Sequence, residues 1–383
     1  MPEAPVLATW RGVEQLLDSY AGVSPADHVV VLYTSDSRDA AAWVSAALRV
    51  RGVPSHREWM APLHDEGFAA RLEAILPRPD EVEGRLVVLT FEKDTMSHTR
   101  ALAEALAGFD RERVVVYRAI STCADLFTHA LTPTPQELTD RNASLLERLM
   151  PARHLRIRTR SGSELEVDID SDRHRWISNR GLARPGGVTI LPAGEVATYP
   201  AAIRGRFVAD FAFNVNAITD QDARLGGHPV TVVVEDGRAV DYACDDPETL
   251  RFLHECFRTQ CAVNVGELGF GTNGGVREAI SMNSHINERR PGVHLGFGQH
   301  NQDPGVVGYQ CPIHLDLIAT GGLVWVDGDE VPLDLEHVIP SAAPHPVSPR
   351  DEDVFSPELD ELDVDDCCGI ITSEGLCPFP SPT

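Results

Sequence analysis

The hydrophobic pattern of this chain changes near its middle. Between about residue 28 and residue 130, short runs of β-branched residues are each followed by a stretch with apolar positions at helical spacing. This alternation predicts βα units whose strands lie side by side in a parallel sheet. A further helix, 135–150, is expected to bridge the two halves. The predicted strand and helix pairs are 28–33 with 38–50, 85–90 with 97–108, and 113–117 with 121–130.

From His154 onward, the pattern is that of short strands separated by turns. Ser161-Gly162 and Asp236-Gly237 each separate two alternating runs, as hairpin turns do. Strands are predicted at 155–160, 165–169, 207–213, 230–235, 239–243, 314–320 and 323–326, and a helix at 247–258. We therefore expect an α/β plus α+β fold. Its N-terminal parallel βα domain would span residues 1–150, and a second domain, with its chemistry on loops and strand ends, residues 151–339.

The globular pattern ends near Pro340. The segment from Pro340 to Thr383 contains ten Asp and Glu against one Arg, and it is also rich in proline. Such a segment cannot bury enough apolar surface to offset the entropy cost of ordering it. We expect a disordered acidic linker at residues 340–366 and a Cys-rich tail at residues 367–383 that is too short to fold alone.

Composition narrows the classes of function. The formal charge is -25, whereas a general nucleic-acid binder needs clustered Lys and Arg for its phosphate contacts. No apolar run reaches the roughly 18 residues that a membrane span needs, and the N-terminus lacks the features of a secretory signal. We therefore expect a cytoplasmic protein. In a reducing cytoplasm, the cysteines of the body are expected to be buried thiols: Cys123, Cys244, Cys256, Cys261 and Cys311.

Neither half contains a convincing nucleotide-binding loop. The first predicted strand is followed by Thr34 to Ser37, where a nucleotide domain would have a glycine-rich phosphate loop. Gly269 to Gly274 matches the spacing of the dinucleotide fingerprint, but it lacks the βαβ context that this motif requires. We therefore do not predict a nucleotide domain.

The candidate chemistry concentrates in residues 266–316, where metal-binding side chains lie among glycine-rich turns. His314 and Asp316 are two positions apart, so a strand would point both side chains from one face. The candidate ligands are Glu195, Glu267, His294, His314 and Asp316. Carboxylates and imidazoles without a thiolate favour Zn, Co, Mn or Fe(II) over a structural cysteine site. If all five hold two divalent ions, one positive charge remains and favours a bridging hydroxide.

The motifs around these residues resemble a known peptidase family. They are Leu-Pro-Ala-Gly-Glu195-Val, Gly-Glu267-Leu-Gly-Phe-Gly-Thr-Asn273, Val-His294-Leu-Gly-Phe-Gly and Ile-His314-Leu-Asp316. They are similar to those of the thermophilic metalloaminopeptidases, called aminopeptidase T or the M29 family, and the similarity is best over about residues 150–330. The resemblance implies that the five residues hold a co-catalytic pair of Zn, Co or Mn ions. It also implies a homodimer that hydrolyses N-terminal residues from peptides.

The segment between the two histidines departs from the family pattern. The family usually has a tyrosine shortly after the first histidine, whereas here residues 299–304 contain none and Tyr309 follows later. We take Glu195, Glu267 and Tyr309 as the candidate catalytic residues.

The same scaffold also resembles a ring-cleaving dihydroxypyridine dioxygenase, in which two histidines and one aspartate hold a single Fe(II). His294, His314 and Asp316 would supply that triad. The presence of both Glu195 and Glu267 favours two metals over one.

Ordinary structural roles are the alternative for several of these residues. Glu195 follows Gly194 and could cap a helix or accept hydrogen bonds from turn amides. Arg289-Arg290 and 204–206 could bind a substrate carboxylate, but a solvated surface position is favoured. Structural roles are expected for His154, His174, His254 and His285.

The tail suggests a second function. Thiols and hydroxyls are the groups that peptide-tailoring enzymes modify, and an acidic flexible linker would let them reach a separate enzyme. The candidate modification sites are Cys367, Cys368, Thr372, Ser373 and Cys377. The chain would then be the precursor of a ribosomally made, post-translationally modified peptide, with the M29-like body as leader or carrier. A cysteine-based metal or redox tail and an inert end are the alternatives, and adjacent Cys367 and Cys368 do not match the usual zinc spacing.

Overall fold

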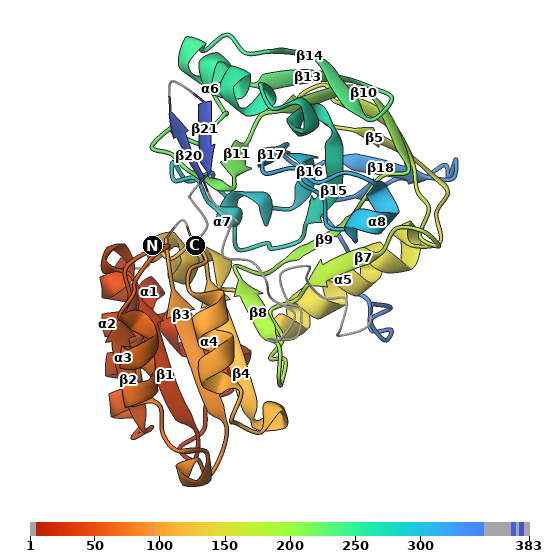
Figure 1. The fold of residues 1–383 in the computed structure, drawn as a ribbon. Coiled ribbons are helices and arrows are strands. Elements are labelled where there is room, and N and C mark those ends of the chain that lie inside the picture. The colour runs from red at the N-terminus through yellow and green to blue at the C-terminus, as the bar shows by residue number, and fades with distance from the viewer. Residues whose placement is uncertain (1–4, 94, 348–368, 373–374, 379–383) are drawn as a thin grey trace.

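The computed structural model describes residues 5–93, 95–347, 369–372 and 375–378. The first half of the chain forms a five-stranded sheet in the order β2-β1-β3-β4-β8, in which all neighbours are parallel. Its strands are β1 (His28–Tyr33), β2 (Ser55–Trp59), β3 (Leu86–Phe91), β4 (Val114–Ala119) and β8 (Val188–Leu191). The predicted parallel βα arrangement is confirmed (Figure 1). β2 was not predicted, because it is an exposed edge strand with little apolar pattern.

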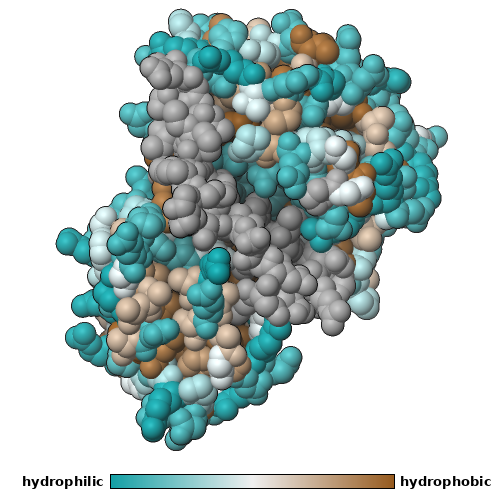
Figure 2. Space-filling model, viewed as in Figure 1, coloured by the Kyte–Doolittle hydropathy of each residue, from teal (hydrophilic) through white to brown (hydrophobic). Residues whose placement is uncertain are grey.

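Helices cover both faces of this sheet. α1, α2 and η5 contribute to the apolar core on one face, and α3 and α4 to the core on the other. Figure 2 shows apolar side chains at the surface over α3 and α4, where Ile75, Ala101 and Phe109 are only partly buried. The elements are α1 (Pro5–Gln15), η1 (Leu16–Tyr20), η2 (Ser35–Ser37), α2 (Arg38–Val50), α3 (Phe68–Ile75), η3 (Pro79–Glu81), α4 (Thr99–Leu106), η4 (Arg111–Arg113) and η5 (Leu126–Ala130).

Helix α5 (Pro135–Leu149) bridges the two halves, as predicted. It begins at a capping box, in which the side chain of Thr134 accepts from the backbone of Glu137 and the Glu137 carboxylate accepts in return. Leu138, near its start, packs into the core of the first half. Leu145 and Leu149, near its end, pack into the core of the second half.

The second half consists of two antiparallel sheets that share one apolar core. One sheet has the order β14-β13-β10-β6-β5-β18-β19: β5 (His154–Arg158), β6 (Glu164–Asp168), β10 (Ala202–Ala209), β13 (Val230–Glu235), β14 (Arg238–Ala243), β18 (Leu323–Val326) and β19 (Leu333–Asp334). The other has the order β11-β17-β16-β15-β9-β7: β7 (Trp176–Asn179), β9 (Glu195–Thr198), β11 (Ala212–Val215), β15 (Val265–Gly271), β16 (Gly292–Gly298) and β17 (His314–Ile318). The short helical elements are α6 (Pro247–Phe257), η6 (Gln260–Val263), α7 (His285–Glu288) and α8 (Pro304–Val307).

The two halves are joined by more than α5. Strand β8 follows α5 in the sequence, between β7 and β9 of the second half, but completes the parallel sheet of the first. Beyond the carboxyl end of β4, the Ser121 hydroxyl accepts a hydrogen bond from the backbone N–H of His285 at the start of α7. The carboxyl end of the parallel sheet therefore lies against the part of the second half that contains residues 285–288.

The tail is partly ordered, which its composition did not predict. Residues 369–372 form β20 (Gly369–Thr372) and residues 375–378 form β21 (Gly375–Pro378), an antiparallel hairpin. β20 pairs in parallel with β12 (Ala217–Ile218) of the body, so the segment gains a sheet partner that it lacks alone. The start of the predicted linker also contacts the body, because Ser341 donates its backbone N–H to Asp140 and Val347 is buried. The rest of the predicted disordered tail lies outside the described residues.

Candidate metal centre

The five predicted ligands come from four neighbouring strands of the six-stranded sheet. Glu195 begins β9, Glu267 lies in β15, His294 lies in β16, and β17 carries His314 and Asp316. They form two groups whose donor atoms lie within 4.8 Å of one another, Glu195 with Glu267 and His294, and Glu267 with His314 and Asp316. Glu267 belongs to both groups. The structure therefore brings the five residues together, and that they bind metal stays a prediction.

Glu267 and His294 lie within regular strands, whereas the sequence analysis placed them among glycine-rich turns. The register pairs Glu267 with Gly296, and Gly296 in turn with Asp316, so these three residues form a row on one face of the sheet. Gly269 is paired with His294 in the next row. Glycines at alternate positions therefore line the same face as the ligands.

These glycines leave the space that the ligand side chains occupy. A Cβ atom at Gly269 would overlap the imidazole of His294. A Cβ atom at Gly296 would lie 2.8 Å from Cβ of Glu267 and 3.0 Å from Oδ1 of Asp316. Glycine weakens a strand because it has no side chain to pack, so its recurrence here has a positional reason. The repeat Gly-x-Gly in β15 and β16 forms a cradle for the ligands.

The ligand atoms are close enough to share ions. Nε2 of His294 lies 2.9 Å from Oε1 of Glu195 and 3.5 Å from Oε1 of Glu267. In the second group, Nε2 of His314 lies 3.2 Å from Oδ1 of Asp316. The Nδ1 atom of His314 is 3.1 Å from the carbonyl oxygen of Gln299, which can only accept, so Nδ1 is the donor and Nε2 is free to bind a metal.

Amide side chains orient the carboxylates. Asn301 donates to Oε2 of Glu267 at 3.1 Å. Asn214, paired with Asp316 in the sheet, donates to Oδ2 of Asp316 at 3.4 Å and to Glu288 at 2.9 Å. Such outer contacts are typical of metal ligands, whose orientation they fix.

Two buried residues at the site, Glu288 and Arg289, differ from the sequence analysis, which did not name Glu288 and favoured a solvated position for Arg289. Arg289 is 3% exposed, and its guanidinium contacts Oε2 of Glu195 and lies 2.9 Å from Oε1 of Glu288. The prediction of a solvated Arg289 is therefore wrong, because this side chain turns inward to neutralise buried carboxylates. The only sequence signal that Glu288 and Arg289 belong to the site was their position just before the His294 motif. The same contact excludes the helix-cap alternative for Glu195, whose carboxylate faces His294 and Arg289.

The electrostatics of the site are dominated by its carboxylates. Burial lowers the pKa of His314, but Asp316 and Glu267 outweigh it and raise that pKa to about 10. Burial and the nearby Asp316 carboxylate raise the pKa of Glu288. Burial would raise the pKa of Asp316, but His314 holds it below its usual range. A divalent ion must displace the proton of His314, so metal affinity should fall as the pH is lowered.

The residues present fit divalent metal ions. Oδ1 of Asp316 is buried and makes no hydrogen bond among the described residues, although Nε2 of His314 lies 3.2 Å away. An ion or water bound there would supply the contact that this buried oxygen lacks. The donor set consists of carboxylate oxygens and imidazole nitrogens, as Zn, Co, Mn and Fe(II) prefer. We conclude that the two groups form a candidate metal centre.

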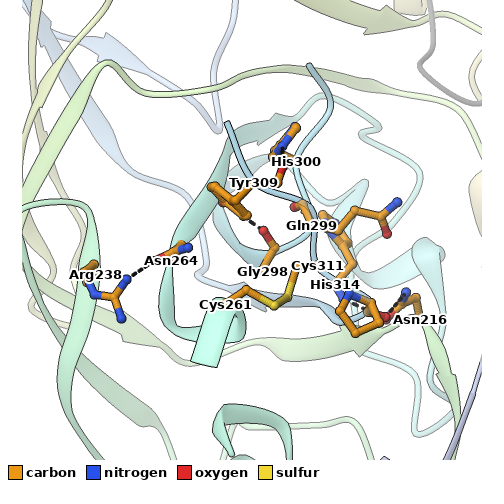
Figure 3. The surroundings of a disulfide bond; sticks show 11 residues. Asn216, Arg238, Cys261, Asn264, Gly298, Gln299, His300, Tyr309, Cys311 and His314 are labelled. Carbon is orange, nitrogen blue, oxygen red and sulfur yellow. Dashed lines mark hydrogen bonds between the residues drawn. A yellow bond between two sulfur atoms is a disulfide. The ribbon is translucent and has the colours of Figure 1, made fainter. Parts of the chain in front are cut away.

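Tyr309 lies outside both donor groups. Its hydroxyl donates to the carbonyl oxygen of Gly298 at 2.9 Å, and its ring packs against that of His300. Figure 3 shows Tyr309 beside the Cys261–Cys311 disulfide, with His314 and Gln299 also near that bond. A catalytic role for Tyr309 stays a prediction.

The disulfide corrects the prediction that the body cysteines are all thiols. Cys261 and Cys311 are 50 positions apart in the sequence, but their Cα atoms are 5.6 Å apart and their sulfur atoms are bonded. Sequence spacing carries no information on this approach, because it depends on how η6 meets the segment before β17. Cys123, Cys244 and Cys256 are free, and Cys256 is buried as expected.

Other predicted residues lie elsewhere. Arg204 and Arg206 are exposed on β10, as expected for surface arginines. Among the candidate modification sites, Cys367, Cys368 and Ser373 lie outside the described residues, whereas Thr372 ends β20 and Cys377 lies in β21. None of the described helices is long and apolar enough to cross a membrane.

Two solved structures have a fold similar to that of this chain. A solved structure of 2,5-dihydroxypyridine dioxygenase from Pseudomonas putida KT2440 matches with a TM-score of 0.60 and 15% identity, covering 88% of this chain and 99% of that chain. The structure of AmpT from Thermus thermophilus, an M29 aminopeptidase, matches with a TM-score of 0.55 and 13% identity, covering 88% of this chain and 100% of that chain. The chain has the AmpT-type fold. At these identities the likeness establishes the fold alone.

A family model matches part of the second half. The model described as crocagin biosynthetic protein CgnE/B matches residues 209–321. This segment of the AmpT-type fold contains Glu267, His294, His314 and Asp316 but not Glu195. No curated protein matches the chain.

Proposed function

We propose that this chain is a metal-dependent hydrolase of the M29 aminopeptidase type, which binds two divalent ions and removes N-terminal residues from peptides. The observation that carries the proposal is the membership of Glu267 in both donor groups. A carboxylate shared by two groups is suited to bridge two ions, whereas a mononuclear triad of His294, His314 and Asp316 would need neither Glu195 nor Glu267.

The chain's own residues would shape such a centre. Glu195, Glu267 and His294 would hold one ion, and Glu267, His314 and Asp316 the other. A bound pair would polarise a peptide carbonyl and lower the pKa of water. Arg289 holds Oε2 of Glu195, which leaves Oε1 directed at the site.

The charge balance also supports a site for cations. The three ligand carboxylates are buried together, and Arg289 offsets only part of their charge. A buried excess of negative charge is unfavourable unless it is paired, and divalent ions would supply that pairing. Because Arg289 adds a positive charge that the sequence analysis omitted, an anionic ligand would be favoured at a centre that holds two ions.

Metal content and turnover test the proposal together. We expect two Zn, Co or Mn ions per chain in protein purified from its native host, and hydrolysis of amino-acid amides by that protein. Glu267→Gln should lower the content of both ions, whereas Glu195→Gln and Asp316→Asn should each lower mainly one. Glu164→Gln, on an exposed position of β6, is the matched control. One iron per chain that survives Glu267→Gln would contradict the proposal and favour the mononuclear oxygenase.

A second candidate is a precursor of a modified peptide whose M29-like domain is the leader or carrier. The match to a crocagin biosynthetic family over residues 209–321 favours it, together with the thiols and hydroxyls of residues 367–383. Peptide-modifying enzymes would be its partners. Intact mass of protein from the native host tests it, because a mass shift confined to residues 367–383 is expected. An unmodified tail would leave the hydrolase without this second function.

A further inference from the structure

The body of this protein already pairs with one extended peptide segment, its own tail. β20 lies between β12 and β21, with Gly369 opposite Ala217 and Ile370 opposite Ile218. β21 packs beside α6, and Figure 1 shows the hairpin next to that helix. β12 is bonded to no other strand among the described residues. The tail therefore binds as a strand added to an edge of the body.

The edge at β12 is prepared for this pairing by Asn283. Its side-chain amide accepts from the backbone N–H of Val215 and donates to the carbonyl oxygens of Val215 and Ala217. Asn283 is 6% exposed, so it takes the place of a neighbouring strand on one side of residues 215–217. Backbone groups alternate in direction along a strand. Those of Ile218 therefore point away from Asn283, toward the side where a new strand can add.

This edge is continuous with the metal centre. Asn216, the residue before β12, donates its backbone N–H to His314, and its side chain accepts from the backbone N–H of His314 at 2.7 Å. Two residues earlier, Asn214 holds Asp316. With about 3.8 Å between consecutive Cα atoms and about 4.8 Å between strands, Gly369 lies within roughly 9 Å of Asn216.

We propose that the β12 edge is a docking site for an extended peptide backbone beside the metal centre, and that residues 369–372 of this chain, with residues 375–378 paired to them, occupy it in cis. Main-chain pairing accepts varied side chains, which suits a site that holds a peptide for processing. The tail belongs to the same chain, so its docking is intramolecular and needs fewer backbone bonds than the binding of a separate peptide would. The proposal goes beyond hydrolysis and requires no turnover at the metal centre.

Hydrogen exchange of the full chain tests the docking. Proline removes the backbone N–H and is not tolerated in a central strand, so Ile370→Pro with Ile371→Pro should release β20. We expect exchange in fragments that cover residues 217 and 218 to quicken at least about tenfold. The matched control, Val354→Pro with Phe355→Pro, lies upstream of the hairpin and should behave as the unaltered chain. All four substitutions lie after Val347, so the sequence of the apolar core formed by the described residues up to that point is unaltered and the variants should fold.

A synthetic peptide of residues 367–383 completes the test. It should restore slow exchange at residues 217 and 218 in the Ile370→Pro, Ile371→Pro variant. It should bind the unaltered chain at least tenfold more weakly than it binds this variant, because the tail of the unaltered chain already fills the site. Equal exchange rates in the unaltered chain and the variant would overturn the proposal. Protection that grows with protein concentration would also overturn it, because the occupant would then be the tail of a second copy. Neither readout uses metal or turnover, so failure here is distinct from failure of the hydrolase proposal.

Discussion

At the scale of single residues, the candidate metal centre depends on glycines, which have no side chain, as much as on the ligand side chains. Each of the two ligand groups lies on a sheet face that glycines keep open, at Gly269 beside His294 and at Gly296 between Glu267 and Asp316. A side chain at either position would compete with a ligand for the same space. The glycines are therefore part of the candidate metal centre.

Substitution at Gly296 tests this role. Gly296→Ala should weaken metal binding at least about tenfold, because the added Cβ displaces Glu267 or Asp316 and a misplaced ligand loses most of its binding free energy. Titration calorimetry with Zn or Mn measures the affinity. Gly227→Ala, where a Cβ would meet nothing within 4 Å, should bind as the unaltered protein does. Equal metal affinity in Gly296→Ala and Gly227→Ala would show that a Cβ atom at Gly296 does not displace the ligands.

A carboxylate between β2 and α3 should control acid stability. Hydrogen bonds from Arg71 lower the pKa of Asp65 to about 2, and the backbone N–H groups of Ala61 and Gly67 contribute. Because this folded-state pKa lies below the unfolded value of about 3.9, the stabilisation is present above pH 4 and is lost as the pH falls toward 2.

Asp65→Asn should therefore lower Tm at neutral pH and flatten the fall of Tm between pH 5 and pH 2.5. Thermal unfolding followed by circular dichroism measures both effects. Glu66→Gln changes the exposed neighbouring carboxylate and should leave the pH profile as it is. A profile for Asp65→Asn as steep as that of the unaltered chain would contradict the assignment.

At the scale of elements, α5 contacts the backbone of the candidate metal centre. Its buried Asn142 donates to the backbone carbonyl oxygen of Glu195 at 2.9 Å and accepts from the hydroxyl of Thr272 at 2.6 Å. The helix thus fixes the backbone of a ligand. The cap at Thr134, eight positions earlier in the sequence, hydrogen-bonds Glu137 and should stabilise the helix.

Two substitutions in and before α5 should separate these roles. Thr134→Ala should cost about 1 kcal/mol of unfolding free energy by removing the cap, with unchanged metal content. Asn142→Ala should cost about 1–3 kcal/mol because it leaves buried polar partners unsatisfied, and it should also lower metal content through Glu195. Urea unfolding and metal analysis measure the two quantities. Full metal content in Asn142→Ala would show that Glu195 keeps its position without this contact.

At the scale of the whole molecule, the acidic tail is not a uniform appendage. Its first residues pack on the body, where His345 lies 3.0 Å from the Ser178 hydroxyl and Val347 is 6% exposed. Farther along, Gly369 and Ile370 pair with β12. Boundaries drawn from composition therefore cut through contacts that the folded protein makes.

Two truncations follow from this division. A chain that ends after Val347 should keep its metal content, and its turnover of amino-acid amides should stay within about twofold if the hydrolase proposal holds, because no described metal ligand follows Asp316. A chain that ends after Ile339 should have a lower Tm, because it loses the buried Val347 side chain. Differential scanning and amide hydrolysis compare the two chains. Equal Tm values would show that residues 340–347 add no stability.

The local pattern of the chain determined much of this protein. Runs of apolar residues predicted β1, β3, β4, α2 and α5, because helix and strand periodicity act over a few residues. The types of residue in the motifs indicated the candidate ligands, because carboxylates and imidazoles can bind metal wherever they lie in a fold. The parallel first half and the strand-rich second half followed from the same local signals.

Tertiary structure alone decided which distant residues meet. It brought Glu195 within reach of Glu267 and His294, buried Arg289 against Glu195, joined Cys261 to Cys311 and gave β20 a partner in β12. These contacts depend on strand register and on packing between segments far apart in the chain. Sequence periodicity predicts neither register nor packing, because it determines the face on which a side chain lies and not the strand that will lie next to it.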